Sequence, residues 1–298
     1  MNERTIYALG FFDGVHRGHA ALLTACRELA DELGCKAGVV TFSSHPDQLV
    51  YGTAPGLINT AYDRERLLRE YFSMDTVITL PFDRRMMATP WQDFFQMLVG
   101  EYHAAGLVCG EDFRFGHRGE GNGEKLMAAC REAGIPGIVI PQMLLDQVAV
   151  SSTYIRSLIE MGMMRSAVRY LGHPHLLTGN VVHGHQLGRR LGMPTANLML
   201  PKELVVPKMG VYACKCLIDG RHYAAVTNVG TRPTVAGIGI TVETWILDYE
   251  GDLYGREICL EFYEFLRPEI RFPGLQDLQE AVRRDAEKTK EILKEIDR

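Results

Sequence analysis

Two histidines three residues apart give the first half of the chain its clearest chemical signal. The segment 10–19 reads GFFDGVHRGH and contains His16 and His19. Residues with this spacing share one face of a helix. If a helix begins near Gly18, both imidazoles stand at its N-terminus, where unpaired N–H groups and the helix dipole attract anions. Such a pair could bind a triphosphate and stabilise charge at its α-phosphoryl group during nucleotidyl transfer, without a covalent step.

The glycines of this segment agree with a phosphate site. Gly10 and Gly14 would let the backbone approach a phosphate closely. The alternatives are that the two histidines only cap the helix or that they bind a metal. No carboxylate or cysteine lies at ligand spacing from them, which disfavours the metal.

A second polar segment could complete the phosphate site. Residues 151–156 read SSTYIR, and the hydroxyls of Ser151, Ser152 and Thr153 could cap the helix that follows. Arg156 lies four residues after Ser152, so its two-pronged guanidinium could reach the same phosphates. The alternative is an ordinary helix start.

The most distinctive stretch lies in the second half, at residues 179–198. Gly184, Gly188 and Gly192 recur every four residues around Arg189, a pattern that can wrap phosphates with backbone N–H groups. It lacks the GK[ST] ending of a Walker loop. The sequence PTAN follows at once, beginning with Pro194.

Thr195 and Asn197 of this PTAN sequence are alternate residues of an expected strand, so both side chains should face the same side. Two neutral oxygen ligands together with ATP phosphates suit Mg²⁺, which accepts few protein ligands. The sequence therefore predicts a Mg²⁺–ATP contact here.

Glu243 lies in the apolar and β-branched sequence TVETWIL. A carboxylate on the inner face of a strand is costly unless it is used or paired. Such a group could act as a general base that takes the proton of an alcohol. The alternative is a strand residue that faces solvent.

The elements that must position these residues change character along the chain. In the first half, β-branched strands at 5–10, 37–42, 75–80, 106–110 and 137–140 alternate with helical patterns at 19–33, 62–72, 90–103 and 123–133. This alternation predicts a mostly parallel sheet with helices on both faces. Ligands of such sheets bind beyond the carboxyl ends of the strands, so residues 10–19, 41–46 and 110–116 should converge on one crevice.

Two short helices are expected at 152–161 and 163–171. After them, the sequence pattern becomes typical of antiparallel strands. Alternating segments at 176–183, 210–218, 222–229, 240–249 and 256–265 predict a small antiparallel barrel or sandwich. Residues 275–296 have helical periodicity and should pack on it as an amphipathic surface helix. We therefore expect two domains, at 1–172 and 173–298.

Composition excludes several classes of protein. The 298 residues are 46% hydrophobic and 23% charged, as in ordinary globular proteins. With 32 Lys and Arg against 37 Asp and Glu, the net charge of −5 argues against nucleic-acid binding by bulk charge. Seven cysteines without a CxxC pair favour a reducing cytoplasm, and the absence of a long apolar run or a signal-like N-terminus disfavours a membrane location.

Taken together, the first-half motifs resemble the FMN adenylyltransferase module of bacterial bifunctional riboflavin kinase/FAD synthetases, members of the HxGH nucleotidyltransferase superfamily. The resemblance rests on GFFDGVHRGH, TFSSHP (41–46), GEDFRFG (110–116) and SSTYIR in this order. It implies a Rossmann-like domain and FMN contacts at His45 and Asp112. The ATP contacts that it implies are Gly10, Phe11, Asp13, His16, His19, Ser152, Thr153 and Arg156. Tyr154, where the family often has a basic residue, and Asp112, where some members carry Asn, depart from the pattern.

The second-half motifs resemble the riboflavin kinase module of the same family. They are the glycine-rich pattern through PTAN, GVYA (210–213), NVGTRPT (228–234), the ETWIL glutamate and LRPEIRF (266–272). The resemblance implies that Glu243 is the catalytic base and that Thr195 and Asn197 contact Mg²⁺–ATP. Met193 replaces a more common aromatic residue.

The resulting expectation is a bifunctional enzyme that phosphorylates riboflavin to FMN and then adenylylates FMN to FAD and pyrophosphate. Its partners would be riboflavin, FMN and ATP, with neither nucleic acid nor membrane. His16, His19 and Arg156 would hold the phosphates in the second reaction. Two alternatives are a nucleotidyltransferase for another substrate with a regulatory barrel, and a flavin-binding regulator without ATP turnover.

Overall fold

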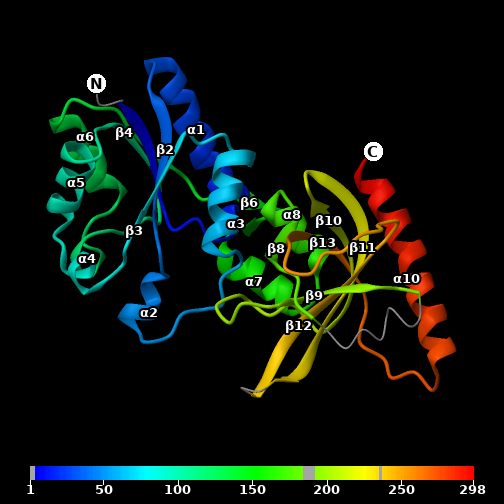
Figure 1. The fold of residues 1–298 in the computed structure, drawn as a ribbon. Coiled ribbons are helices and arrows are strands. Elements are labelled where there is room, and N and C mark those ends of the chain that lie inside the picture. The colour runs from blue at the N-terminus through cyan, green and yellow to red at the C-terminus, as the bar shows by residue number, and fades with distance from the viewer. Residues whose placement is uncertain (1–3, 184–191, 235–236) are drawn as a thin grey trace. The chain divides into compact units, whose positions relative to one another are not determined.

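A computed structural model describes residues 4–183, 192–234 and 237–298 of the chain (Figure 1). The chain forms two compact units. The first contains residues up to Pro55 together with Arg64–Ser152, and the second contains Gly56–Asp63 and Thr153–Arg298. The predicted domain boundary between residues 172 and 173 stays a prediction.

The first unit is built on a parallel sheet in the order β3-β2-β1-β4-β5. Its strands are β1 (Thr5–Leu9), β2 (Lys36–Phe42), β3 (Thr76–Leu80), β4 (Ala104–Gly110) and β5 (Gly137–Ile140). All five lie within two residues of their predicted bounds. The order reverses between β1 and β4, and this switch point is where ligands bind in such sheets.

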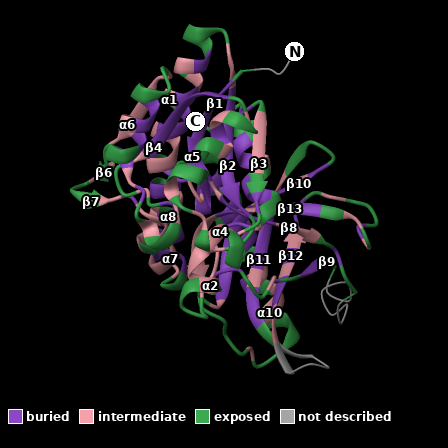
Figure 2. Cartoon of the chain, turned by 90° about the vertical axis from the view of Figure 1, so that its left-hand side faces the viewer, coloured by how far each residue is buried: buried purple, intermediate pink, exposed green. Residues whose placement is uncertain are grey.

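Helices cover the two faces of this sheet. They are α1 (Arg17–Leu33), α5 (Trp91–Gly100) and α6 (Gly123–Glu132), whereas the short helices α2 (Pro46–Val50) and α4 (Arg84–Ala88) have no buried residue. Tyr7 and Leu9 of β1 share a core with buried side chains of α5 and α6. The alternate residue Ile6 lies on the other face, where the thiol of Cys26 in α1 donates to its carbonyl at 3.2 Å. Buried residues follow the strands and the inner helix faces (Figure 2).

Four features of the first half were not predicted or differ from prediction. Helices α2 and α4 and the hairpin β6 (Leu144–Leu145) and β7 (Val148–Ala149) had no expected counterpart. The helix expected at 62–72 is α3 (Ala61–Arg66), continued by a π-helical turn at Leu67–Tyr71. The chain passes from the second unit to the first between Asp63 and Arg64, within α3.

The second unit contains an antiparallel sheet in the order β8-β13-β10-β11-β12-β9. Its elements are β8 (His175–Asn180), β9 (Thr195–Met199), β10 (Gly210–Ile218), β11 (Arg221–Thr234), β12 (Gly237–Ile246), β13 (Glu257–Arg267), α7 (Ser152–Glu160), α8 (Met164–Leu171) and α10 (Leu275–Ile296). An antiparallel bridge between Val182 and Asn197 links the two ends of the sheet, which curls as a small barrel. The predicted α/β plus β-barrel class is therefore confirmed.

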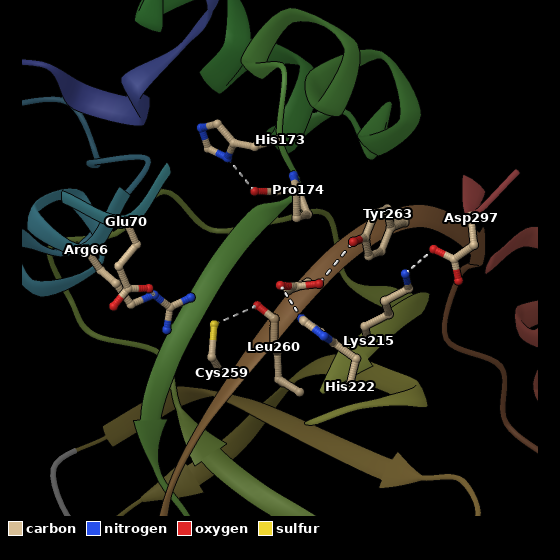
Figure 3. A network of polar contacts seen from close by, with 11 residues as sticks. Arg66, Glu70, His173, Pro174, Lys215, His222, Cys259, Leu260, Tyr263 and Asp297 are labelled. Carbon is tan, nitrogen blue, oxygen red and sulfur yellow. Dashed lines mark hydrogen bonds and ion pairs between the residues drawn. The ribbon is translucent and has the colours of Figure 1, made fainter. Parts of the chain in front are cut away.

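Helix α10 packs on β10 and β11, as its amphipathic pattern predicts (Figure 1). A part-buried ion pair anchors it, because Arg267 of β13 donates from Nη2 to the Asp285 carboxylate at 2.8 Å and from Nε at 3.0 Å. Beyond the helix, Lys215 donates to Asp297 at 2.5 Å, close to Glu261, which is hydrogen-bonded to a histidine and a tyrosine (Figure 3).

None of the seven cysteines forms a disulfide, and all lie in the described part of the chain. Among the described helices, none has the length and the apolar composition needed to cross a bilayer.

His175 at the start of β8 is a buried titratable group of the barrel. It is 1% exposed and packs against the ring of Phe262, with 5.7 Å between the ring centroids. Its Nδ1 has no hydrogen-bond partner in the described residues. Burial, followed by the nearby His173, lowers its pKa from 6.5 to about 4. His175 is therefore neutral in the folded barrel at neutral pH.

We predict that this histidine makes the barrel sensitive to acid. As pH falls from 6.5 toward 4, the unfolded chain binds a proton that folded His175 does not, so stability is complete above pH 6.5 and is lost below it. The loss should approach about 3 kcal/mol. His175→Gln should abolish this component in urea unfolding between pH 7.5 and 4.5, whereas His222→Gln on the same sheet should leave it. Parallel pH profiles for wild type and His175→Gln would contradict the prediction.

Candidate active sites

The turn before α1 positions the predicted histidine pair. Three residues of the turn have left-handed backbone conformations, namely Phe12 (φ 58°), Gly14 (φ 80°) and Val15 (φ 38°). Such conformations are costly for a bulky or β-branched residue and are concentrated at functional sites. The strained turn leads directly into His16 at the N-terminus of the helix.

His16 is the N-cap of α1. Its Nδ1 accepts the backbone N–H of His19 at 3.3 Å, so this nitrogen carries the lone pair and the ring proton lies on Nε2. The two imidazoles stack, with centroids 3.6 Å apart and an interplanar angle of 12°. A Cβ at Gly18 would lie only 3.2 Å from the His16 ring, which explains the glycine between them. Capping, one of the alternatives for these residues, is thus present together with the shared helix face.

The surroundings of His19 keep its ring neutral. Its Nδ1 is buried without a hydrogen-bond partner in the described residues. Burial, followed by the positive potential of His16 and of Arg64, lowers the pKa of His19 well below 6.5. At neutral pH this imidazole can therefore offer a neutral N–H donor to an anion, and not a full positive charge.

The loops after β1 and β2 are joined, as predicted for one crevice. The Thr41 hydroxyl donates to the carbonyl of Phe11 at 2.9 Å. The Phe11 ring meets the His45 ring edge-on, with 4.9 Å between centroids. His45 also caps α2, since its Nδ1 accepts the N–H of Asp47 at 3.2 Å.

The other residues predicted for this site lie on several different elements. Ser152 donates from its hydroxyl to the carbonyl of Asp13 at 2.9 Å, which ties the SSTYIR segment to the strained turn. Asp112 follows β4 and is exposed. Thr153 and Arg156 belong to the second unit, where Arg156 Nη1 donates to the Thr153 hydroxyl at 3.5 Å. Gly10 follows β1, and its amide donates to Val40.

Strand register builds the second site in the barrel. Asn197 of β9 is paired with Glu243 of β12, which is paired with Asn228 of β11. Asn228 is paired with Val211 of β10, and Val211 with Arg267 of β13. Directly paired residues face the same side of a sheet, so these five side chains form one row across five strands.

Four residues of this row, Val211, Asn228, Glu243 and Arg267, border a cavity of about 570 Å³ between the sheet and α10. Its walls include Thr195, Asn228, Glu243, Arg267 and Glu269, with apolar side chains such as Trp245 and Phe272 between them. An apolar pocket with a few convergent polar groups is the usual form of a small-molecule site. Glu243 is half-buried in the wall of this cavity.

A second cavity, of about 550 Å³, lies on the other side of the PTAN strand. It is bordered by Pro194, Thr195, Asp252 and Tyr254, among others. Thr195 therefore reaches both cavities. Asn197 is 5% exposed, and its Oδ1 has no hydrogen-bond partner in the described residues.

Part of the predicted glycine-rich loop lies outside the described residues, namely Gly184, Gly188 and Arg189. Gly192 is described and has φ 72°, a conformation that favours glycine. Met193 is buried and lines the larger cavity. No cluster of three or more His, Cys, Asp and Glu side chains suited to a metal occurs in the described part of the chain.

Sequence reasoning missed two residues at these sites. Arg64 is buried beside Phe11, and Asp285 pairs with Arg267 at the cavity wall. Both are charged residues within charged helical stretches, where the sequence pattern indicates a solvent-exposed face. No local signal distinguishes them from their exposed neighbours.

Comparison with known proteins agrees with this division into two sites. The family model described as FAD synthetase matches residues 1–154, and the one described as riboflavin kinase matches residues 171–293. The chain is 37% identical over 286 residues to the bifunctional riboflavin kinase/FMN adenylyltransferase of Haemophilus influenzae, covering 95% of this chain and 92% of that one. This chain belongs to the bifunctional riboflavin kinase/FMN adenylyltransferase family.

Two further proteins are similar to this chain, and one of them is described by a name from outside this family. The corresponding protein of Escherichia coli K12 is also 37% identical, with 95% of this chain and 91% of that one covered. A crystal structure from Streptococcus pneumoniae, described as a macrolide-efflux protein, is 28% identical and superposes with a TM-score of 0.87. That alignment covers 97% of this chain and 95% of the other, so the two proteins share the whole fold.

The geometry of the adenylyltransferase histidines leads to a measurable prediction. In NMR titration of the imidazole nitrogens, wild-type His19 should remain neutral at pH 6, below the ordinary pKa of 6.5. His16→Ala should raise the pKa of His19, because it removes the coulombic effect of the neighbouring imidazole and admits water to the ring. His222→Ala, on the barrel, should not change it. Wild-type His19 titrating near pH 6.5 would contradict the proposed environment.

Proposed function

We propose that the chain makes FAD from riboflavin in two steps at two sites, with the adenylyltransferase in residues 1–172 and the kinase in residues 173–298. The observation that carries the kinase assignment is the position of Glu243 in the wall of the larger cavity, in one row with Asn197. For the adenylyltransferase it is the stacked histidine pair at the N-terminus of α1. We place this activity in the cytoplasm, where thiols such as those of this chain stay reduced.

In the kinase site, Glu243 accepts the proton of the riboflavin 5′-hydroxyl as that oxygen attacks the γ-phosphorus of ATP, and ADP leaves. An alcohol is a weak nucleophile at neutral pH, so a positioned base contributes directly to the rate. The apolar wall around Trp245 and Phe272 suits a flat flavin ring, and Asn228 is held by donating to Glu269 at 3.0 Å. The remaining catalysis is positioning and charge neutralisation.

Mg²⁺ fits the donors that this site offers. Asn197 presents a buried side-chain oxygen that lacks a hydrogen-bond partner in the described residues, and Thr195 presents a hydroxyl at the border of both cavities. These two neutral oxygens would hold the ion together with ATP phosphates, as Mg²⁺ prefers oxygen ligands and few protein contacts. When bound, the ion would neutralise charge on the phosphates. Gly184, Gly188, Arg189, Gly192 and Pro194 would contact ATP.

In the adenylyltransferase site, the phosphate of FMN attacks the α-phosphorus of a second ATP, and pyrophosphate leaves. A phosphate monoester is already ionised at pH 7, so this reaction requires no general base. His16 and His19 would donate hydrogen bonds to the phosphates, joined by Arg156. The helix N-terminus that carries the two histidines adds its own partial positive charge.

The other predicted contacts complete the binding of the two substrates in the adenylyltransferase. His45 and Asp112, which follow β2 and β4, would contact FMN on either side of the sheet's switch point. Gly10, Phe11, Asp13, Ser152 and Thr153 would contact ATP.

The two activities should separate by mutation. Glu243→Gln keeps the shape of the side chain but removes the base, and should lower riboflavin phosphorylation by about 10²- to 10⁴-fold while adenylylation of supplied FMN persists. His19→Ala should have the opposite effect. Products of riboflavin, ATP and Mg²⁺ would be resolved over time by chromatography. Glu261→Gln is the matched control, because this carboxylate lies on the same sheet but outside the cavity.

Two outcomes would contradict the two-site assignment. One is loss of both activities in a folded Glu243→Gln or His19→Ala protein. The other is FMN adenylylation without any riboflavin phosphorylation by the wild type, which is what a purely regulatory barrel predicts.

A further inference from the structure

Arg64 is a buried cation in the adenylyltransferase unit that none of the motifs includes. It lies in α3, and the residue is only 2% exposed. Its Nη2 donates to the carbonyl of Phe42 at 2.8 Å, and its Cζ lies 4.5 Å from the centroid of the Phe11 ring. Its Nη1 is buried with no hydrogen-bond partner in the described residues.

Burial of the Arg64 guanidinium lowers the stability of the fold. Removing a charge from water is costly unless hydrogen bonds and opposite charges replace the water. Burial lowers the pKa of Arg64, and the negative charge of Asp13 acts in the opposite direction. One hydrogen bond, one aromatic face and one carboxylate leave this cation incompletely compensated, which is a feature of functional sites more often than of cores.

The partners of Arg64 belong to the segments around β1 and β2 that are predicted to share one crevice. Phe11 and Asp13 lie in the loop after β1, and Phe42 is the last residue of β2, just before the loop that contains His45. The Phe11 ring under the guanidinium is also the ring that contacts His45. A single side chain thus fixes the loop predicted to bind ATP relative to the loop predicted to bind FMN.

We propose that Arg64 is a positioning residue of FMN adenylylation, which aligns these two loops and provides a fixed positive charge close to His19. This inference rests on the proposed function of the unit. Arg64 contacts Phe42 and Phe11 and its charge acts on His19, so its proposed action runs through these residues and not through direct contact with substrate. A fixed charge in a site shielded from water acts strongly on the charges that develop there.

The charge of Arg64 also acts on His19. The groups that set the potential at this ring are His16, which stacks on it, Arg64 and Asp13 beyond Arg64, while Phe12 packs beside it. The positive charge of Arg64 lowers the pKa of His19, although burial contributes more. Removing that charge should therefore raise the pKa of His19 and extend its protonated form to higher pH.

The experiment compares Arg64→Gln, which removes the charge but keeps a hydrogen-bond donor, with Arg64→Lys, which keeps the charge but loses the planar fork. Arg66→Gln is the matched control, because Arg66 lies on the same helix and pairs with Glu70 at 3.8 Å near the surface. Each full-length protein is assayed for FMN adenylylation across pH, with riboflavin phosphorylation and thermal unfolding measured on the same preparation.

We expect Arg64→Gln to lower kcat/KM for adenylylation by about 10-fold or more, with phosphorylation unchanged. The acid limb of its adenylylation profile should move to higher pH by about 0.5 unit or more, since His19 would protonate earlier. Arg64→Lys should keep the wild-type acid limb while kcat/KM falls, because one ammonium cannot hold both loops in the same geometry. Arg66→Gln should match wild type.

A purely structural role gives a different result. It predicts that Arg64→Gln lowers the unfolding temperature while the acid limb stays in place, and this outcome would overturn the proposal. Adenylylation within twofold of wild type in both folded variants would also overturn it. If Arg64→Gln does not fold, Arg64→Lys decides alone, since an acid limb that moves despite the retained charge refutes the electrostatic part. Wild type that makes no FAD would instead refute the proposed function itself.

Discussion

The adenylyltransferase unit depends on keeping two imidazoles stacked and largely buried at a helix N-terminus. Two rings 3.6 Å apart cannot both carry a positive charge without strong repulsion, so protonation of one disfavours protonation of the other. Burial, followed by His16 and by the cation Arg64, keeps His19 neutral, and Nδ1 of His16 accepts a hydrogen bond from the helix backbone. The strained turn at Phe12 and Val15 follows from this requirement, because it delivers His16 to the cap position directly from the end of β1.

In the barrel, the register of the paired strands positions the side chains of the site. Five paired strands place Asn197, Glu243, Asn228 and Arg267 in one row, in which Glu243 and Asn228 are paired with a neighbouring strand on both sides and Arg267 on one. A shift of one residue in any strand would turn its member of the row to the opposite face. Helix α10 then closes the row into a cavity, anchored by the Arg267–Asp285 pair.

Much of this organisation could be predicted from local patterns. The parallel strands, α1 and α10 have strong periodicity, and the HxGH and PTAN segments combine unusual residue types at short spacing. Charged residues that interact across a long distance in the sequence have no such local pattern. Arg64 follows Asp63 and precedes Glu65, as a surface residue would, and only tertiary structure buries it under Phe11. Helices α2 and α4 are single short turns whose formation depends on caps from His45 and Asp83 and not on apolar periodicity.

The chemistry of the two nucleophiles explains why the two sites differ. Riboflavin reacts through an alcohol, which must lose its proton, and the barrel provides a carboxylate in the wall of an apolar cavity. FMN reacts through a phosphate that is already ionised, so the parallel-sheet unit needs no base and must instead bring two anions together. For that task a neutral histidine pair has an advantage. Its N–H groups donate hydrogen bonds to phosphates and, unlike the extra proton of an imidazolium, they are not lost as the pH rises. A permanent cation such as Arg64, set behind the pair, can then offset the repulsion between the two anions.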